Sequence, residues 1–200
     1  MGAARTAEWP SRLKAFQALG VLMAAMIAVH AFNAFVLGHA WDRFGIHPRG
    51  AGGLWPGVIA APFLHISNLH LWNNLLVLAV LGGMTALVAG NARFLAATAC
   101  IALVGGALTW LFARSGSHIG ASGLVFGYFG FLVGQGLFQR SLASLVVAGV
   151  VTFFYGTNIF FGIFFPKGCT SWEAHLAGAA TGLAYARLEL ATTRWKVRGR

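Results

Sequence analysis

The chain has 200 residues, of which 58% are hydrophobic and only 9% are charged, and its formal net charge is +10. Soluble domains carry roughly a quarter of their residues as charged side chains, so the composition excludes an ordinary soluble domain and indicates one polytopic membrane bundle. The basic excess does not indicate nucleic acid, because the basic residues lie at the chain ends and in short loops, the pattern of membrane topology and anionic lipid contact.

Six segments are each long and apolar enough for a membrane-spanning helix, which needs about 20 mostly apolar residues. A short basic lead-in at residues 1–14 precedes them, and a basic tail at 193–200 follows. The helices are predicted at 15–37, 69–89, 94–113, 119–138, 142–165 and 172–192. The long first connection, 38–68, contains Trp41, Trp55 and several prolines and glycines, and we expect it to lie partly in the membrane interface.

The distribution of Lys and Arg predicts the orientation of these helices. Alternate loops and chain ends carry ten of the basic residues on one side and four on the other. The side with more basic residues is expected in the cytoplasm, so both termini are expected to be cytoplasmic. The membrane itself is expected to be the inner or plasma membrane. The helices at 69–89, 119–138 and 172–192 then begin on the extracytoplasmic side, where His70, Ser122 and His175 share a similar shallow depth.

A serine and a histidine near two of these helix starts indicate nucleophilic chemistry. Ser122 follows Gly120 and Ala121, and a serine hydroxyl within reach of a neutral imidazole such as His175 is the minimum equipment for acyl transfer. Only four acidic residues are present. Glu173 lies two residues from His175 and therefore faces nearly the opposite side of the helix. The sequence thus favours a Ser-His dyad over a triad.

His70 and Asn74 are spaced i, i+4 and project from one helix face. Their side-chain N–H groups, with the backbone N–H of Ser122, could stabilise a developing oxyanion, and His65 could support them. Ordinary interhelical polar contact is the alternative for these residues. Small-residue helix packing is the alternative for His175, which shares a face with Gly178 and Gly182.

Four histidines could meet on the outer side and hold a metal ion: His65, His70, His118 and His175. Their spacing lacks the i, i+4 histidine pair and glutamate of a helical zinc site, so we expect no metal and no cofactor. Cys100 falls in an apolar run and Cys169 in a loop, so a disulfide between them is not expected either.

Taken together, these motifs resemble the rhomboid family of intramembrane serine proteases over residues 15–192. The resemblance rests on three groups in the right order: His65, His70 and Asn74; Gly120-Ala121-Ser122-Gly123; and Ala174, His175, Gly178 and Gly182. It implies an all-α polytopic membrane protein with the minimal six-transmembrane-helix bundle. It also implies cleavage of single-pass or polytopic transmembrane proteins, at segments with helix-destabilising residues near the outer face.

Within that resemblance, Ser122 is the nucleophile and His175 the general base, and His70, Asn74 and the Ser122 backbone N–H form the oxyanion hole. The fifth helix and the loop after it would form a movable gate and cap for substrate entry, including Phe160, Phe161, Phe164, Phe165 and Trp172.

Two positions depart from the family pattern. Phe126 stands where many members carry a tyrosine against the catalytic histidine. The first loop has Trp41-Asp42-Arg43 in place of a Trp-Arg pair, which leaves open how this loop is anchored.

Two other functions remain as alternatives. A rhomboid-like pseudoprotease would bind transmembrane helices without cutting them, although it need not keep both Ser122 and His175. A transporter would need discontinuous helices and an internal repeat, and no repeat is evident in the sequence.

Overall fold

The computed structural model describes residues 8–50, 54–166 and 170–198, with side chains described as far as residue 191. Apart from one isolated β-bridge, the regular structure of these residues is helical. The elements are α1 (Trp9–Phe35), η1 (Ala40–Phe44), α2 (Gly57–Ala60), η2 (Ala61–Phe63), α3 (Asn68–Ala89), α4 (Asn91–Cys100), η3 (Ile101–Gly105, a π-helical turn), α5 (Gly106–Phe112), α6 (Ser122–Gln139), α7 (Leu142–Phe164) and α8 (Trp172–Arg198).

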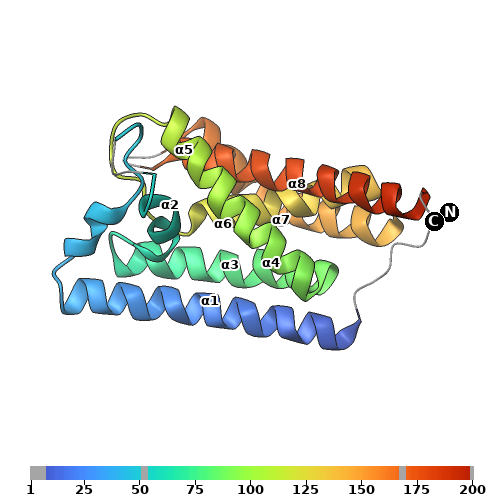
Figure 1. The fold of residues 1–200 in the computed structure, drawn as a ribbon, viewed down its shortest axis with the longest axis horizontal. Coiled ribbons are helices and arrows are strands. Elements are labelled where there is room, and N and C mark those ends of the chain that lie inside the picture. Colours follow the sequence, from blue (N-terminus) through green and yellow to red (C-terminus); the bar gives the residue numbers. More distant parts are fainter. Residues whose placement is uncertain (1–7, 51–53, 167–169, 199–200) are drawn as a thin grey trace.

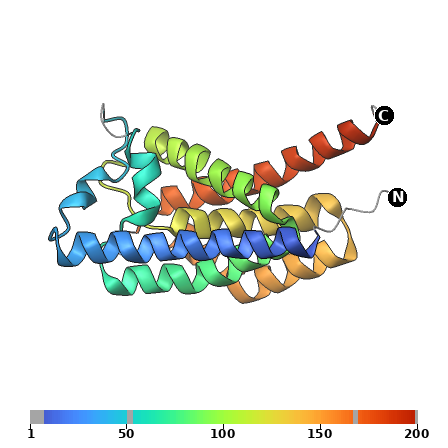
Figure 2. The same ribbon diagram turned by 60° about the horizontal axis from the view of Figure 1, so that its bottom comes forward.

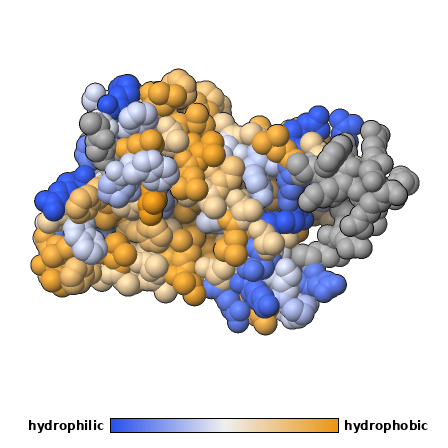
Figure 3. Space-filling model, viewed as in Figure 1, coloured by the Kyte–Doolittle hydropathy of each residue, from blue (hydrophilic) through white to orange (hydrophobic). Residues whose placement is uncertain are grey.

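The long helices run roughly along one axis of a bundle (Figures 1 and 2). The short elements η1, α2 and η2 gather at one end, called here the loop end, where α3, α6 and α8 begin and α7 finishes. The start of α1 and the end of α8 lie at the opposite end, called the far end. On the face shown in Figure 3, apolar residues dominate the middle of the bundle, whereas hydrophilic residues gather towards its two ends. This distribution suits a bundle surrounded by lipid.

Within the part of the chain that the structure describes, four helical segments are long and apolar enough to cross a membrane: α1, α3, the continuous helix at 91–112, and α7. The helices α6 and α8 are outside this set, so the sequence-based count of six spans stays a prediction. Their composition explains the difference. Helix α6 carries five glycines and two glutamines, and α8 combines small residues with Glu173, Arg187 and Glu189.

Helix α6 is the centre of the bundle. Its five successive residues 124–128 are buried, which covers every face of a helix with 3.6 residues per turn. A helix wrapped by protein in this way does not have to be strongly apolar, because its surface faces other helices rather than lipid. It therefore holds its first residue, Ser122, in a fixed place.

The contact between α6 and α8 is made by glycines, as small residues permit in membrane helices. A Cβ atom at Gly178 would overlap the Gly123 carbonyl, one at Gly182 would overlap the Gly127 carbonyl, and one at Gly130 would overlap the backbone of Ala179. The two backbones therefore touch along several turns. This close approach fixes the distance between Ser122 and His175, which stand at the start of these helices.

Four helix boundaries differ by three residues or more from those predicted from apolar length. The third predicted helix begins at Asn91 rather than residue 94. Helix α1 begins at Trp9 rather than residue 15, because Pro10 in its first turn is compatible with a helix start and the polar residues after it tolerate a helix. Helix α6 begins at Ser122 rather than 119, because Gly120 has a φ of +120°, outside the helical region. Helix α8 continues to Arg198, beyond its apolar part.

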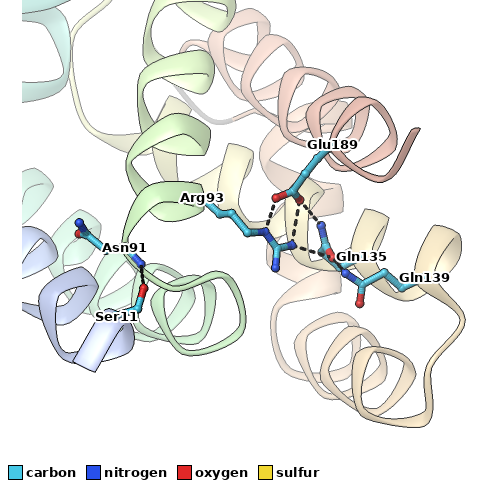
Figure 4. Close-up of polar contacts among 6 residues, drawn as sticks. All are labelled: Ser11, Asn91, Arg93, Gln135, Gln139 and Glu189. Atoms are coloured by element: carbon cyan, nitrogen blue, oxygen red, sulfur yellow. Dashed lines mark hydrogen bonds and ion pairs between the residues drawn. The ribbon is translucent and has the colours of Figure 1, made fainter. Parts of the chain in front are cut away.

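A cluster of polar contacts joins four helices at the far end (Figure 4). Arg93 on α4 forms an ion pair with both carboxylate oxygens of Glu189 on α8, and Gln135 on α6 donates to Glu189 at 2.9 Å. Gln139 donates to Gln135. The N–H of Asn91 also donates to Ser11 Oγ on α1 at 2.9 Å. The start of the 91–112 helix is thereby joined to α1, α6 and α8.

Candidate active site

Ser122 is placed by the loop that precedes α6. In this loop His118 forms the β-bridge with Ile46, the N–H of Gly120 donates to Ala61 O at 2.8 Å, and the N–H of Ala121 donates to His65 Nε2 at 3.3 Å. A Cβ at Gly120 would lie 2.7 Å from His70 Cε1. Glycine is therefore needed here both for its positive φ and for the close approach of His70. Ser122 is the first residue of α6, where backbone N–H groups lack intrahelical partners.

His175 on α8 lies against Ser122, and its hydrogen bonds define its tautomer. Nε2 is 2.9 Å from Ser122 Oγ, and Nδ1 is 2.9 Å from the backbone oxygen of Gly162 on α7. A carbonyl oxygen only accepts hydrogen bonds, so Nδ1 carries the proton and donates to it. Nε2 is then the acceptor for the Ser122 hydroxyl. This is the arrangement in which an imidazole can remove the serine proton.

Phe126, one turn after Ser122, packs against the face of the His175 ring. The two rings are stacked, with centroids 4.0 Å apart and planes 15° from parallel. Phe126 and His175 are each only 7% exposed, which restricts rotation of the imidazole. The aromatic ring at this position thus makes the histidine contact without a tyrosine hydroxyl.

His70 and Asn74 on α3 line the same cavity as Ser122 and His175. The cavity measures about 590 Å³. Asn74 donates from Nδ2 to the backbone oxygen of His70 at 3.0 Å, so one of its two amide protons is used within α3. His70, Asn74 and Ser122, the first residue of α6, all line this one space. The structure therefore brings together the serine, the histidine and the three predicted oxyanion donors.

His65 supports this site from behind. It is fully buried, its Nε2 accepts from Ala121 N–H, and its ring centroid is 5.2 Å from that of His70. Burial, helped by the nearby His70, lowers the pKa of His65 to about 3. His65 is therefore neutral near pH 7, and its Nε2 remains an acceptor for the loop that carries Ser122.

The first loop is anchored by contacts that the Trp41-Asp42-Arg43 sequence does not reveal. Besides the bridge from Ile46 to His118, Arg49 donates from Nη1 to the backbone oxygens of Leu111 at 3.1 Å and Ala113 at 2.8 Å. These carbonyls end α5, where a cation is favoured. The first loop is thus fixed both to the end of α5 and to the Ser122 loop itself.

The other candidates for charge or metal chemistry are engaged elsewhere. Glu173 accepts from the N–H of Arg114 at 3.3 Å and pairs with its guanidinium at 3.5 Å. His118 receives a hydrogen bond from Ser171 Oγ at 2.5 Å and donates to Arg114 O at 3.0 Å. Among the residues that the structure describes, no three His, Cys, Asp or Glu side chains are close enough to hold a metal ion. Cys169, one of the two cysteines between which no disulfide is expected, lies outside the described residues.

Sequence reasoning missed several residues near the site. Tyr155 and Asn158 on α7 and Ser171 line the cavity, and Gly162 supplies the carbonyl for His175. Asn158 could have been identified from the sequence, because a polar residue in an otherwise apolar span usually has a specific role. His30 on α1 was missed too: it is buried, and its Nε2 is 2.9 Å from Asn68 Oδ1, beside His65.

Comparison with known proteins places this chain in a family. The family model for the Rhomboid domain matches residues 52–192. Uncharacterised proteins of Mycobacterium bovis and Mycobacterium tuberculosis are each 44% identical over 166 residues, which cover 78% of this chain and 68% of the relative. An uncharacterised protein of Mycobacterium leprae is 39% identical over 165 residues, covering 78% of this chain and 64% of the relative. The chain belongs to the rhomboid family, which is generally one of intramembrane serine proteases.

Proposed function

We propose that the chain is an intramembrane serine endopeptidase that cleaves transmembrane segments by a Ser122–His175 dyad. The observation that carries this proposal is the hydrogen bond between Ser122 Oγ and His175 Nε2, at 2.9 Å, on a ring whose Nδ1 lies 2.9 Å from the Gly162 carbonyl oxygen. Membership of the rhomboid family supports it, and so does the cavity of about 590 Å³ that opens beside the pair.

The reaction follows from the positions of these groups. Ser122 Oγ attacks the scissile carbonyl carbon while His175 Nε2 takes the hydroxyl proton. The oxyanion is stabilised by donors from His70, Asn74 and the Ser122 backbone N–H. His175 then gives the proton to the departing amine, which leaves an acyl-serine. A water molecule then attacks this ester while His175 Nε2 takes its proton, and His175 returns that proton to Ser122 Oγ as the carboxylic acid product leaves.

The proposed orientation has six spanning helices, both termini in the cytoplasm, and the cavity open to the extracytoplasmic side. It is supported by the excess of basic residues at the chain ends and in alternate loops, and by the hydrophobic middle of the bundle face in Figure 3. The substrate must present an extended strand, since a helix hides its carbonyls in hydrogen bonds. We therefore propose substrates with helix-destabilising residues near the outer face.

Helix α7 and the segment after it are the proposed entry side for the substrate. Their aromatic side chains are largely exposed, with 50–63% exposure at Phe160, Phe161, Phe164 and Phe165. Tyr155 and Asn158, on the same helix, line the cavity. A substrate passing α7 would therefore move directly from lipid to the serine.

Labelling of the purified protein by a fluorophosphonate probe tests the dyad. Wild type is expected to be labelled, and Ser122→Ala and His175→Ala are expected to lose labelling while remaining folded. Ser115→Ala, in an exposed loop outside the cavity, is the control. Peptide mapping must place the label on Ser122 rather than Ser171, which also pairs with a histidine. An unlabelled wild type that stays folded in lipid would favour a non-cutting helix binder and would end the protease proposal.

A further inference from the structure

The acceptor of His175 Nδ1 is a backbone carbonyl at the end of a helix. An α-helical carbonyl normally accepts from the N–H four residues later, which for Gly162 is residue 166. That residue is Pro166, which has no N–H. Helix α7 stops at Phe164, and the N–H of Phe165 donates to Phe161 O at 3.0 Å. The Gly162 carbonyl is thus left without its helical donor.

The absence of a side chain at Gly162 allows α7 to reach the histidine. A Cβ at this position would lie 2.6 Å from Phe126 Cζ and 3.5 Å from His175 Nδ1. The first distance is too short for two non-bonded carbon atoms. A larger residue would therefore push α7 away from the stacked rings. Gly162 and Pro166 therefore support the same hydrogen bond to His175 in different ways. Gly162 allows α7 to come close to the histidine ring, and Pro166 leaves the Gly162 carbonyl oxygen without a helical donor.

The four carboxylates do not serve His175 in this role. Asp42 accepts from Asn33 and is paired with His39. Glu173 is bound to Arg114, Glu189 is paired with Arg93, and Glu8 lies before the start of α1 at the far end. The Gly162 oxygen is the acceptor observed at Nδ1.

We infer that Gly162 and Pro166 are positioning residues that replace the acid of a catalytic triad, by presenting a freed carbonyl that fixes the Nδ1–H tautomer of His175. This inference rests on the proposed protease function. A neutral carbonyl orients the ring as a carboxylate does. It stabilises an imidazolium less, because a carbonyl oxygen carries only a partial charge, whereas a carboxylate attracts the imidazolium with a full negative charge.

The acceptor is carried by the helix with the fewest buried side chains among the long ones whose burial is described. Only Ser144, Val151 and Ile159 are buried on α7. An outward displacement of α7 would break the hydrogen bond to His175 and release the tautomer. The tautomer of His175, and so its ability to accept the serine proton, is thus coupled to the position of α7, the helix past which the substrate is proposed to enter.

The tautomer can be measured directly by nitrogen NMR of protein labelled with ¹⁵N-histidine, in lipid, with His175→Gln assigning the signal. Wild type is expected to show a protonated Nδ1 and an unprotonated Nε2 at His175. A protonated Nε2 in wild type would overturn the inference. The spectrum does not require activity, so it remains informative even where fluorophosphonate labelling fails and the protease proposal falls.

Variants test the two residues separately. Gly162→Ala is expected to lower the maximal rate of fluorophosphonate labelling at least tenfold, since a displacement of about 1 Å can cost about 10²-fold, and to give mixed tautomers. Pro166→Ala restores a competing N–H and is expected to change both readouts in the same direction. Gly149→Ala, on the same helix with open space around it, is the matched control. Folded Gly162→Ala and Pro166→Ala proteins with wild-type spectra and rates would refute the inference.

Discussion

At the scale of single residues, Gly120 is the position where backbone shape and site geometry coincide. Its φ is +120°, and a Cβ would meet the His70 ring at 2.7 Å. Gly116 in the same loop has a φ of +147° but open space around it. Backbone strain of about 1–3 kcal/mol is expected in both alanine variants.

Gly120→Ala is therefore expected to lose fluorophosphonate labelling by at least tenfold beyond its effect on stability, because it displaces a proposed oxyanion donor. Gly116→Ala should lose stability only. The measurement is the labelling rate per folded molecule, together with the unfolding temperature of each variant. Equal labelling in the two variants would show that His70 does not depend on Gly120.

His65 gives a prediction on pH. Its pKa in the folded state is about 3, below the unfolded value of 6.5, so the unfolded chain takes up a proton first as the pH falls. Its contribution to stability is complete above pH 6.5 and is lost progressively between 6.5 and about 3. The unfolding temperature should fall less steeply over this range in His65→Gln, which keeps a side-chain acceptor for Ala121. An unchanged slope would mean that other buried groups account for acid unfolding.

Individual residues also mark how far sequence reasoning reached into this site. Ser122, His175, His70 and Asn74 could be grouped from sequence because each lies near a helix start and all these starts were expected on one side. Gly162 could not, because its contribution is a backbone oxygen and a missing side chain. Only the proline four residues later could have indicated it, since it shows which carbonyl of α7 lacks a helical donor.

At the scale of elements, the α6–α8 contact sets the distance across the dyad. A Cβ at Gly178 would overlap the Gly123 carbonyl, whereas a Cβ at Gly123 would be at an ordinary 3.6 Å from Ala174 O. The two sides of one contact therefore differ in tolerance. Gly178→Ala is expected to cost about 1–3 kcal/mol through overpacking, and Gly123→Ala markedly less. Thermal unfolding in the same detergent compares them, and equal losses would contradict backbone contact at Gly178.

The elements themselves were only partly predictable. Apolar length located all the long helices, because burial in lipid or protein requires it. Boundaries failed where the polar end of a helix extends beyond its apolar part, as at Trp9 and Arg198. The π-helical turn Ile101–Gly105 was also missed. Gly105, its last residue, lies beside Gly178 on α8, whose Cα would be 3.5 Å from a Cβ at Gly105, and local sequence does not record such a contact between helices.

At the scale of the whole molecule, the two ends of the bundle hold different groups of polar residues. The loop end holds the proposed chemistry, and the far end holds the Arg93–Glu189 ion pair with Gln135 and Gln139 (Figure 4). The helices that carry Ser122 and His175 are α6 and α8, and both take part in this polar cluster. A disturbance there should loosen the bundle at the end opposite to the serine.

Glu189→Gln is accordingly expected to lower the free energy of unfolding by about 1–3 kcal/mol. It leaves the Arg93 guanidinium, only 33% exposed, without its carboxylate. The figure is below that for a fully buried pair because water still reaches Arg93. Glu8→Gln, at an exposed position before α1, is the control and should change little. Labelling of Ser122 per folded molecule should remain at the wild-type rate, because the backbone contacts between α6 and α8 lie between the two ends. A large loss of labelling in folded Glu189→Gln, without a change in Glu8→Gln, would instead show that the far end controls the geometry of the dyad.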